Sequence, residues 1–539
     1  MTYIEYVQLS PKEKIKYKFT SFFKNLGHGF INFFVNLYFR LIRFFKGLGR
    51  SFKEVGYAFK HGNVFTKLSF LFLGVGHMAS GQIIKGILIL LVEALFIFYM
   101  IMTGGAAIYG FTTLGNLESY FQCLHGVPDA SGNVNFVLDS NDYHFLDQST
   151  AGEMCELLHP GESIQLTQIR CDNSFTFLLF GLLAIVIIVA FVLFYISTIK
   201  NTILLQERKQ AKLHVSTFFE DIKDYLDGKF HRVLLALPIL GVCVFTILPI
   251  IDMILMAFTN YNRTTSYPRF FSWIGIDNFI TLFGGGMSKS GAKFGLTFVK
   301  ILGWTMIWAV LATFLNYFLG MFVAMLINKK GIKFKKVFRT VLVFSIAMPQ
   351  FISLLAFNKF FAKGGMIESL LKLLGLMSQN DALRILDQAT SARIFIIIVN
   401  IWVGIPYTML AVTGILMNVP EDLYESAQID GASPFTVYTK ITLPYVIFIT
   451  GPKLITDFVG NINNFNVIYF LTGGNPATND YLNAGKTDLL VTWLYKLTVN
   501  QMNYSYASVI GIMIFVICAV LSLIAYRHTS AVKNEEDFA

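Results

Sequence analysis

Charged residues are scarce in this chain. Asp, Glu, Lys and Arg make up 14% of its 539 residues, whereas soluble domains carry about 25%, so an ordinary soluble enzyme is excluded. Hydrophobic residues account for 55% of the sequence and aromatic residues for 15%, and the mean hydropathy is +0.58. Such an apolar excess has to face lipid as well as protein cores. The composition therefore indicates a polytopic membrane protein.

Cysteine is also rare, with five residues, no Cys-x-x-Cys pair and no Cys/His cluster at zinc-binding spacing. Neither a metal site nor a dense disulfide framework has support in this pattern. Three of the cysteines, Cys123, Cys155 and Cys171, fall in one loop between apolar segments. Because an odd number leaves a thiol over, the sequence leaves open whether one disulfide forms there or none.

Catalytic motifs are missing as well. The nearest candidate for a phosphate-binding loop, Gly485-Lys486-Thr487, has Asp480 where the motif requires glycine. The sequence contains no G-x-S-x-G elbow and no H-E-x-x-H pair. We therefore expect no enzymatic activity, cofactor or metal ion in this chain.

Eight stretches are long and apolar enough to cross a bilayer, for which a helix needs about 20 residues. They predict an all-α polytopic membrane protein with about eight transmembrane helices, at residues 83–109, 174–199, 231–259, 295–327, 334–361, 392–416, 445–470 and 505–526. The apolar piece 68–81 is too short to cross alone, and we expect it at the interface or against the first span. An even number of spans places both termini on the same side of the membrane.

Lys and Arg predict which side that is, because basic loops stay in the cytoplasm. Residues 1–67 carry 12 basic residues against three acidic ones, and the loop KKGIKFKKVFR after residue 328 has no acid. The loop 110–173 carries nine acidic residues and one arginine, Arg170. Both termini are therefore expected in the cytoplasm and loop 110–173 outside. The net charge of +10 follows from this topology and does not indicate nucleic acid as a partner.

Residues 24–45 place basic and aromatic side chains on opposite faces at helical spacing. The pattern predicts a basic amphipathic helix in contact with lipid at the inner leaflet. A ninth span is the alternative, although two arginines in a short run are costly at membrane depth. The expected domains are a cytoplasmic segment 1–67, an accessory membrane segment 68–229, a core 230–527 and a cytoplasmic tail 528–539.

The loop EDLYESAQIDGASPFTVYTKITLP, residues 421–444, predicts two short helices joined by a turn. Acidic residues follow Pro420, where they complement a helix N-terminus. Gly431 allows a sharp turn or a close backbone approach. Apolar Leu423 and Ile429 lie among acids, which suits a short helix that docks into a groove of another protein. A plain helical connector is the alternative.

The same loop resembles the E-A-A, G and I-x-L-P signature of inner-membrane permease subunits of binding-protein-dependent ABC importers. Ser426 stands where the signature has its central alanine. The resemblance implies a coupling helix that sits in a cleft of a cytoplasmic ATPase subunit. The coupling residues would be Glu425, Ser426, Ala427, Asp430, Gly431, Ile441, Leu443 and Pro444.

The resemblance covers about residues 230–527. The stretches PQFIS (349–353), NIWVGIPYTML (400–410), NINNF (461–465) and TDLL (487–490) are similar to the larger permease subunit of maltose and maltodextrin importers. This implies a type I ABC importer permease fold in the bacterial plasma membrane. The implied partners are a second, smaller permease, two ATPase subunits that bind ATP and Mg, an external solute-binding protein and an oligosaccharide. The large external domain that some members carry after the span at 231–259 is replaced by the short segment 260–294.

Amides and aromatic rings at membrane depth mark a candidate sugar path, because sugars present hydroxyl groups and apolar ring faces. Buried amides also act as glue between helices, which is the alternative. The resemblance favours the path, with Asn461, Asn464, Tyr407, Gly404, Asp457 and Gln350 as its residues. Lys453 is the expected salt-bridge partner of Asp457, since it lies four residues earlier on the same helix.

The interpretation is therefore one subunit of an ATP-driven importer of maltodextrin-like oligosaccharides. The sequence departs from the maltose subunit at Ile346, Gln350, Asp457 and Gly460, so import of another oligosaccharide is an alternative. A secondary transporter driven by ions is a second one, with Asp457, Glu93 and Asp252 as its ion relay. A membrane scaffold without transport is a third.

Overall fold

The computed structural model describes residues 39–40, 42–43, 46–47, 49–115, 120–128, 134–138, 148–169, 172–265, 270–284, 289–329 and 332–527. They divide into two compact units, Met1–Trp273 and Ile274–Ala539. The amphipathic pattern at 24–45 lies almost entirely outside the described residues, as do the tail 528–539 and Cys171. The domain boundary predicted near residue 230 was based on the family resemblance and not on how compactly the chain packs. The division into compact units therefore does not test it, and it stays a prediction.

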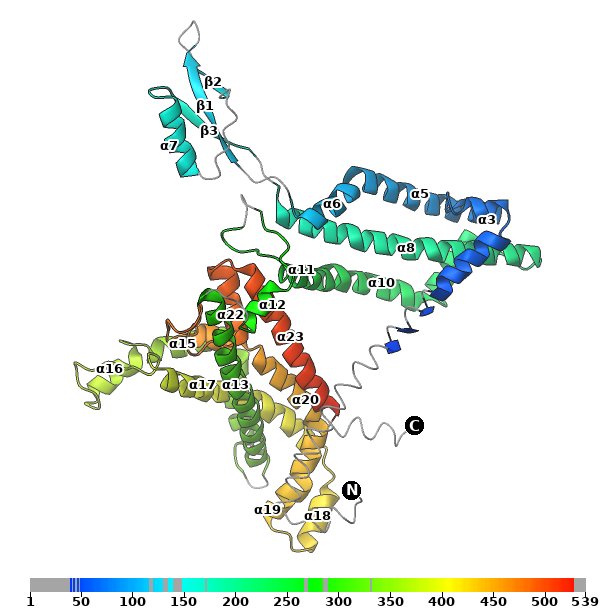
Figure 1. The fold of residues 1–539 in the computed structure, drawn as a ribbon. Helices are drawn as coiled ribbons and strands as arrows, with labels where there is room; N and C mark the ends of the chain where they lie inside the picture. Colours follow the sequence, from blue (N-terminus) through cyan, green and yellow to red (C-terminus); the bar gives the residue numbers. More distant parts are fainter. Residues whose placement is uncertain are drawn as a thin grey trace. The chain divides into compact units, whose positions relative to one another are not determined.

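The first unit contains long apolar helices that pack side by side. They are α5 (Ile83–Tyr99), its continuation through the π-helical turn η1 (Met100–Gly104) into α6 (Gly105–Thr113), and α8 (Ser174–Gln210) (Figure 1). Ile89 of α5 packs against Ile199 and Ile203 of α8. At the other end of the pair, a Cβ on Gly110 or Gly181 would overlap an aromatic ring of the facing helix. Glycine is therefore needed for α6 and α8 to approach this closely.

Shorter helices are anchored to this pair. They are the helical residues 49–61, α3 (Val64–Leu68) and α4 (Val75–Ala79). The backbone N–H of Leu73 donates a 2.9 Å hydrogen bond to the carboxylate of Glu93 in α5, and Lys200 of α8 lies 2.5 Å from Glu54. The piece 68–81 is thus packed against the first span, which is one of the two places expected for it.

The third predicted span of this unit is also helical. It consists of α10 (Phe230–Val242), the π-helical turn η2 (Cys243–Ile247) and α11 (Leu248–Met256), and α9 (Phe218–Leu226) precedes it. A capping box of Thr217 and Glu220 starts α9. α11 packs against α8.

Loop 110–173 contains a small folded cap, which the all-α prediction did not include. Its sheet has the antiparallel order β2-β1-β3 and carries α7 beside it: β1 (Tyr120–Pro128), β2 (Val134–Leu138), α7 (Gln148–Leu158) and β3 (Ile164–Ile169) (Figure 1). A disulfide joins Cys123 of β1 to Cys155 of α7. Short strands in a polar loop give little periodic signal, and a unit this small depends on such a covalent link.

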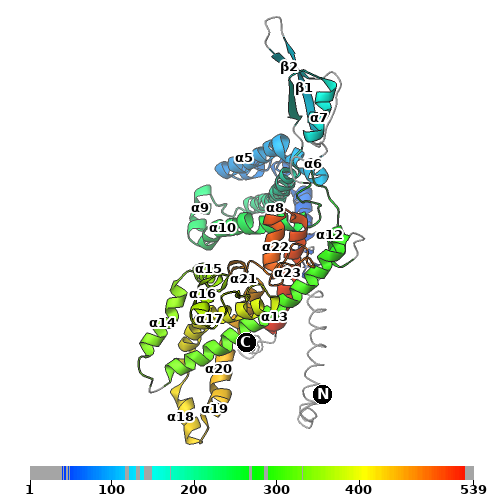
Figure 2. The ribbon, with the colours of Figure 1, turned by 90° about the vertical axis from the view of Figure 1, so that its left-hand side faces the viewer.

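The second unit is built around four long helices: α13 (Lys289–Asn328), α17 (Ala389–Leu416), α20 (Leu443–Ile462) and α23 (Tyr504–Arg527). α13 packs against α17 and α20, and α20 against α23. The shorter elements are α12 (Asp277–Leu282), α14 (Lys335–Ala347), α15 (Gln350–Phe361), α16 (Met366–Leu373), α18 (Glu421–Ile429), α19 (Pro434–Val437), η3 (Tyr438–Thr442), α21 (Phe465–Leu471), α22 (Leu490–Tyr495) and η4 (Lys496–Asn500). Within this unit, α18 and α19 lie at the end of α20 that is remote from α22 (Figures 1 and 2).

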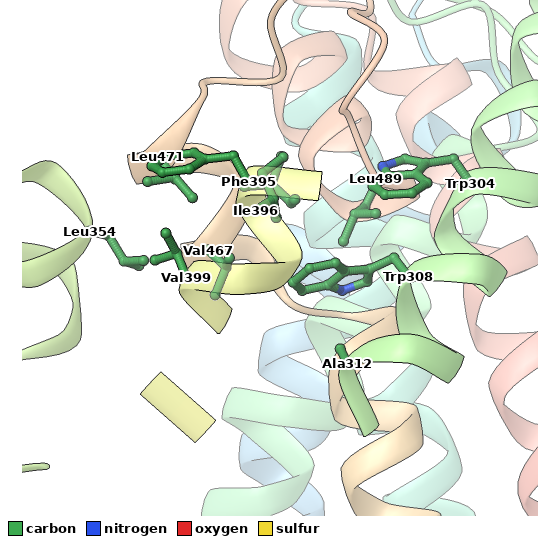
Figure 3. Close-up of a cluster of buried hydrophobic side chains, with 11 residues drawn as sticks. Trp304, Trp308, Ala312, Leu354, Phe395, Ile396, Val399, Val467, Leu471 and Leu489 are labelled. Atoms are coloured by element: carbon green, nitrogen blue, oxygen red, sulfur yellow. The ribbon is translucent and has the colours of Figure 1, made fainter. Parts of the chain in front are cut away.

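The core of the second unit forms where α13, α17 and α21 meet. Trp304 and Trp308, one turn apart on α13, lie beside Leu489, while Val399 of α17 and Val467 of α21 extend the cluster toward Leu354 of α15 (Figure 3). The indole N–H of Trp304 donates to the carbonyl of Thr487 at 3.1 Å. The core therefore fixes the TDLL stretch against α13.

The structure is roughly consistent with the prediction of about eight spans, and the exact number stays a prediction. In the described part of the chain, six helices are long and apolar enough to cross a membrane, and a bent pair, Lys335–Ala347 with Gln350–Phe361, makes up to seven. The pair bends by 90° next to Pro349, which disfavours helix at the residue before it. Segment 445–470 breaks into α20 and α21 at Asn463–Asn464, and its Lys, Asp and Asn residues lower its hydropathy.

Candidate translocation path and coupling loop

The coupling loop folds as the predicted helix, turn and helix. α18 ends in a Schellman motif, in which Ala432 N–H donates to Ala427 and Gly431 N–H to Gln428. Gly431 has φ +69°, and a Cβ there would meet nothing within 4 Å. Of the two roles expected for this glycine, the structure supports the sharp turn. The hydroxyl of Ser433 then caps α19 by accepting from Thr436 N–H at 3.2 Å.

The loop presents apolar side chains to its surroundings. Ile429 is 86% exposed and Phe435 74% exposed, although both are large and apolar. The coupling residues Glu425, Ser426, Asp430, Gly431 and Pro444 are exposed, while Ala427, Ile441 and Leu443 are half-buried. The Tyr424 hydroxyl lies 3.2 Å from that of Thr442 and ties α18 to η3. The loop is thus a fixed protrusion with an apolar tip and acidic flanks, suited to docking in a groove.

The two predicted path asparagines contact each other and α13. Asn461 donates from its side-chain amide to the Thr313 hydroxyl at 3.0 Å, and Asn464 donates to the amide oxygen of Asn461 at 3.3 Å. Asn464 also accepts from Val467 N–H, so it caps α21. The indole N–H of Trp308 donates to the backbone carbonyl of Asn461. These contacts join helices to one another, as expected for the alternative in which the buried amides connect helices and do not line a sugar path.

Gly404 faces the same helix, α13. A Cβ on Gly404 would lie 2.1 Å from the amide nitrogen of Asn316, so only glycine leaves room for that side chain. The amide oxygen of Asn316 and the amide nitrogen of Asn400 are buried and have no hydrogen-bond partner among the described residues. Buried amides without partners at membrane depth are costly unless a ligand or water satisfies them. Asn316 and Asn400 are therefore candidates for contact with a sugar. They were not identified from the sequence, although the rule that selected Asn461, an amide at membrane depth, applies to them as well.

Tyr407 and Asp457 lie on more open surfaces. Tyr407 is 51% exposed on α17. Asp457 pairs with Lys453 at 2.5 Å, as predicted, and both line a shallow hollow between α13, α17 and α20. The hollow also includes Tyr317 and Thr450, whose hydroxyls lie 2.7 Å apart. Gln350 begins α15, which packs against α21.

An aromatic face follows the break after α20. Phe465 stacks on Tyr469 with ring centroids 4.7 Å apart, and Tyr495 meets both rings edge-on at 5.0 and 5.2 Å. The hydrogen bond to Tyr469 raises the pKa of Tyr495 above its ordinary value. Stacked rings with hydroxyl groups at their edges are suited to contact with sugars. Tyr495 was not identified from the sequence, since it is 26 residues from Tyr469 in another helix.

The three acidic residues that would form the ion relay of a secondary transporter have other partners or belong to different units. Glu93 accepts the N–H of Leu73, and Asp457 is neutralised by Lys453. Asp252, 9% exposed in the first unit, has one carboxylate oxygen without a partner in the described residues. The path itself offers amides, hydroxyls and rings rather than a set of metal ligands.

Comparisons with known proteins identify relatives among transport proteins. Residues 316–534 match the family described as "Binding-protein-dependent transport system inner membrane component". The maltodextrin transport system permease protein MdxF of Bacillus subtilis (strain 168) is 31% identical over 86% of this chain and 95% of its own length. The galactooligosaccharides transport system permease protein GanP of the same organism is 33% identical over 68% of this chain and 86% of its own length.

Among solved structures, a bacterial ABC transporter involved in the import of alginate is similar to 58% of this chain and 98% of its own chain, with 24% identity and a TM-score of 0.44. The chain belongs to the family of inner-membrane permease components of binding-protein-dependent ABC importers.

Proposed function

We propose that this chain is one of two membrane subunits of an ATP-driven oligosaccharide importer, and that maltodextrin-like glucosides are its substrates. The observation that carries the proposal is the helix–turn–helix loop 421–444, with exposed apolar side chains at its tip, in a chain that matches 95% of the length of MdxF. GanP, whose name specifies a galactooligosaccharide, is similarly related, so this class of sugar is the second candidate substrate.

The loop would transmit the energy of ATP. Two partner ATPase subunits would bind ATP and Mg, and the loop would insert Ile429 at the end of α18 and Phe435 of α19 into a groove of one of them. Closure of the ATPase pair would then move α18 and the helices joined to it. Sugar would be delivered by an external solute-binding protein into a cavity shared with a second, smaller permease, in an alternating-access cycle.

The proposed orientation places the coupling loop and both termini in the cytoplasm. The Cys123–Cys155 disulfide supports this, because disulfides persist in oxidising surroundings and the cap lies in loop 110–173. The basic loop near Lys335 supports it independently, since such loops remain in the cytoplasm.

Sugar contacts are proposed for the exposed and unpartnered polar groups of the second unit. Tyr407 and the Phe465–Tyr469–Tyr495 face would stack on sugar rings. Asn400 would offer its unpartnered amide to a hydroxyl group. Asn461, Asn464 and Gly404 would shape the path through α13, while Asp457 and Gln350 would line it from α20 and α15.

The test is purification of the full-length chain, tagged without histidines, from detergent-solubilised native membranes, followed by reconstitution with the proteins that co-purify. Recovery of a second permease and an ATPase, with ATP hydrolysis stimulated by binding protein plus maltodextrin, supports the proposal. If galactooligosaccharide stimulates ATP hydrolysis and maltodextrin does not, the substrate is a galactooligosaccharide and not the proposed maltodextrin. Transport by the chain without an ATPase overturns the proposal.

A further inference from the structure

Two histidines and a glutamate converge in the cap, far along the chain from the proposed path. The Nδ1 atoms of His125 and His159 lie 2.9 and 3.6 Å from the same oxygen of Glu162. The two imidazole rings stack with centroids 4.2 Å apart and an interplanar angle of 4°. One ligand atom from each residue lies within 4.8 Å of the others.

The fold brings these residues together through a tight turn. His159, Pro160, Gly161 and Glu162 form a β-turn in which Glu162 N–H donates to the His159 carbonyl at 3.3 Å. Gly161 has φ +85°, as the third residue of a type II turn requires, and proline suits the second. The turn therefore places the side chains of its first and fourth residues, His159 and Glu162, next to each other.

The disulfide brings in the third side chain. Cys123 and His125 are two residues apart on β1 and share a face of the strand, while Cys155 and His159 are four apart at the end of α7. Joining Cys123 to Cys155, with Cα atoms 5.8 Å apart, sets His125 opposite His159. Gly126 N–H also donates to the Ser163 carbonyl at 2.8 Å, which holds β1 against the turn.

We propose that His125, His159 and Glu162 form a zinc site in the cap. Two atoms bound to one tetrahedral zinc ion lie roughly 3.3 Å apart, and the two histidine–glutamate separations, 2.9 and 3.6 Å, are close to that value. Because an imidazole nitrogen binds a metal in the plane of its ring, the stacked rings would have to turn out of their parallel arrangement when zinc enters. Two imidazoles and one carboxylate are ligands that Zn²⁺ accepts and that Ca²⁺ and Mg²⁺ do not prefer. The side chain of Glu162 is 45% exposed, so water can complete the coordination.

The site differs from an ordinary ion pair elsewhere in the chain. His214 lies 2.9 Å from Glu220, the same distance as His125 from Glu162, and it belongs to no group of three metal-ligating side chains among the described residues. This pair is a matched control, because it has the carboxylate and one imidazole without the second. The sequence expectation of no metal rested on cysteine spacing, which does not detect a site assembled from β1 and a turn 34 residues later.

The experiment measures zinc on the full-length chain in detergent, purified with a tag that contains no histidine. After exposure to Zn²⁺ and dialysis, we expect about one zinc ion per chain by mass spectrometry. His125→Gln, His159→Gln and Glu162→Gln should each lose it, because each removes one of the three ligands, and His214→Gln should retain it. Equal zinc content in wild type and His125→Gln overturns the proposal.

A second measurement avoids the risk that a variant misfolds. Diethyl pyrocarbonate modifies accessible histidines, and peptide mass spectrometry reports each one in the wild-type chain. Zn²⁺ should protect His125 and His159 but not His214, while Ca²⁺ and Mg²⁺ should protect none of them. Prior reduction of the Cys123–Cys155 disulfide should abolish the protection. Modification of His125 and His159 at the same rate with and without Zn²⁺ contradicts the zinc site.

Discussion

The side-chain amide of Asn461 donates a 3.0 Å hydrogen bond to the hydroxyl of Thr313. This bond joins α20, which continues from the coupling loop, to α13, which also contacts Gly404 through Asn316. α13 is therefore the common wall against which the predicted path residues of α17 and α20 are positioned.

Replacing Thr313 with valine should weaken the contact between α13 and α20. The change keeps the shape of the side chain but leaves the Asn461 amide nitrogen without its acceptor, and interhelical bonds of this kind contribute about 1 kcal/mol. We expect a lower melting temperature of the purified chain. Thr456→Val on α20 is the control, because the hydroxyl of Thr456 is exposed and bonds only within its own helix. Equal melting of both variants would show that the bond contributes nothing.

Ile429→Ser tests the apolar tip of the coupling loop. Ile429 is 86% exposed, so its loss should leave the melting temperature of the isolated chain unchanged. We expect recovery of the ATPase in the purified complex to fall by about tenfold, as for an interface anchor worth roughly 1.4 kcal/mol. Leu373→Ser in α16 is the control, since Leu373 is 82% exposed in a different part of the unit. Full recovery of the ATPase with Ile429→Ser would exclude this residue as an anchor.

Gly431→Asp and Gly431→Asn differ only in charge. Asp and Asn both tolerate the positive φ of this position, and a Cβ there meets nothing inside the chain. We therefore expect both variants to insert into the membrane, and Gly431→Asp to lose sugar uptake because it adds a charge at the proposed ATPase contact. Uptake at the wild-type rate in Gly431→Asp would contradict the role of this turn in coupling.

Asp488→Asn should strongly destabilise the segment after α21. Asp488 is 1% exposed and accepts from Lys496 at 2.6 Å, from Gly485 N–H at 2.7 Å and from Thr492 at 2.9 Å. The substitution leaves the Lys496 charge without a partner, at a cost of about 3 kcal/mol in unfolding free energy.

The exposed pair Asp480–Lys486 provides the matched control for this change. It lies in the same segment, and Asp480→Asn should cost less than about 1 kcal/mol. The two melting temperatures should therefore differ clearly. Similar melting temperatures of the two variants would mean that the buried ion pair of Asp488 does not stabilise the chain more than the exposed one.

The segment around α16 should open in acid. Hydrogen bonds from Lys372 and from the backbone N–H groups of Gly364 and Leu383 lower the pKa of Glu368 from 4.5 to about 2. Because the folded pKa is lowered, the stabilisation is complete above pH 4.5 and disappears as the pH falls toward 2. Pepsin should cleave residues 374–383 faster at pH 2 than at pH 4, after correction with an unstructured peptide. In Glu368→Gln this difference should vanish, and its persistence would exclude Glu368 as the cause.

Apolar runs in the sequence were sufficient to predict most of the long helices, including α8, α13, α17 and α23. The turn at Gly431 was also predictable, because helix capping depends on a few neighbouring residues. The break at Asn463–Asn464 was not, since a hydropathy window averages over the side chain of Asn464 that caps α21. Thr313 and Tyr495 were missed for another reason: each meets its partners across helices, and periodicity contains no information on the rotation of one helix against another. The pairing of Cys123 with Cys155 likewise depends on the sheet, which the sequence analysis did not predict.

The chain from Pro434 to Ile462 is helical without interruption, through α19, η3 and α20. At 1.5 Å per residue this rod is roughly 40 Å long. A tilt of about 10° at its coupling end would displace its far end by roughly 7 Å, a distance larger than the hydrogen bond between Asn461 and Thr313. In the proposed transport cycle this rod would act as a lever, so that a small rotation imposed by the partner ATPase would exchange one set of contacts along α13 for another.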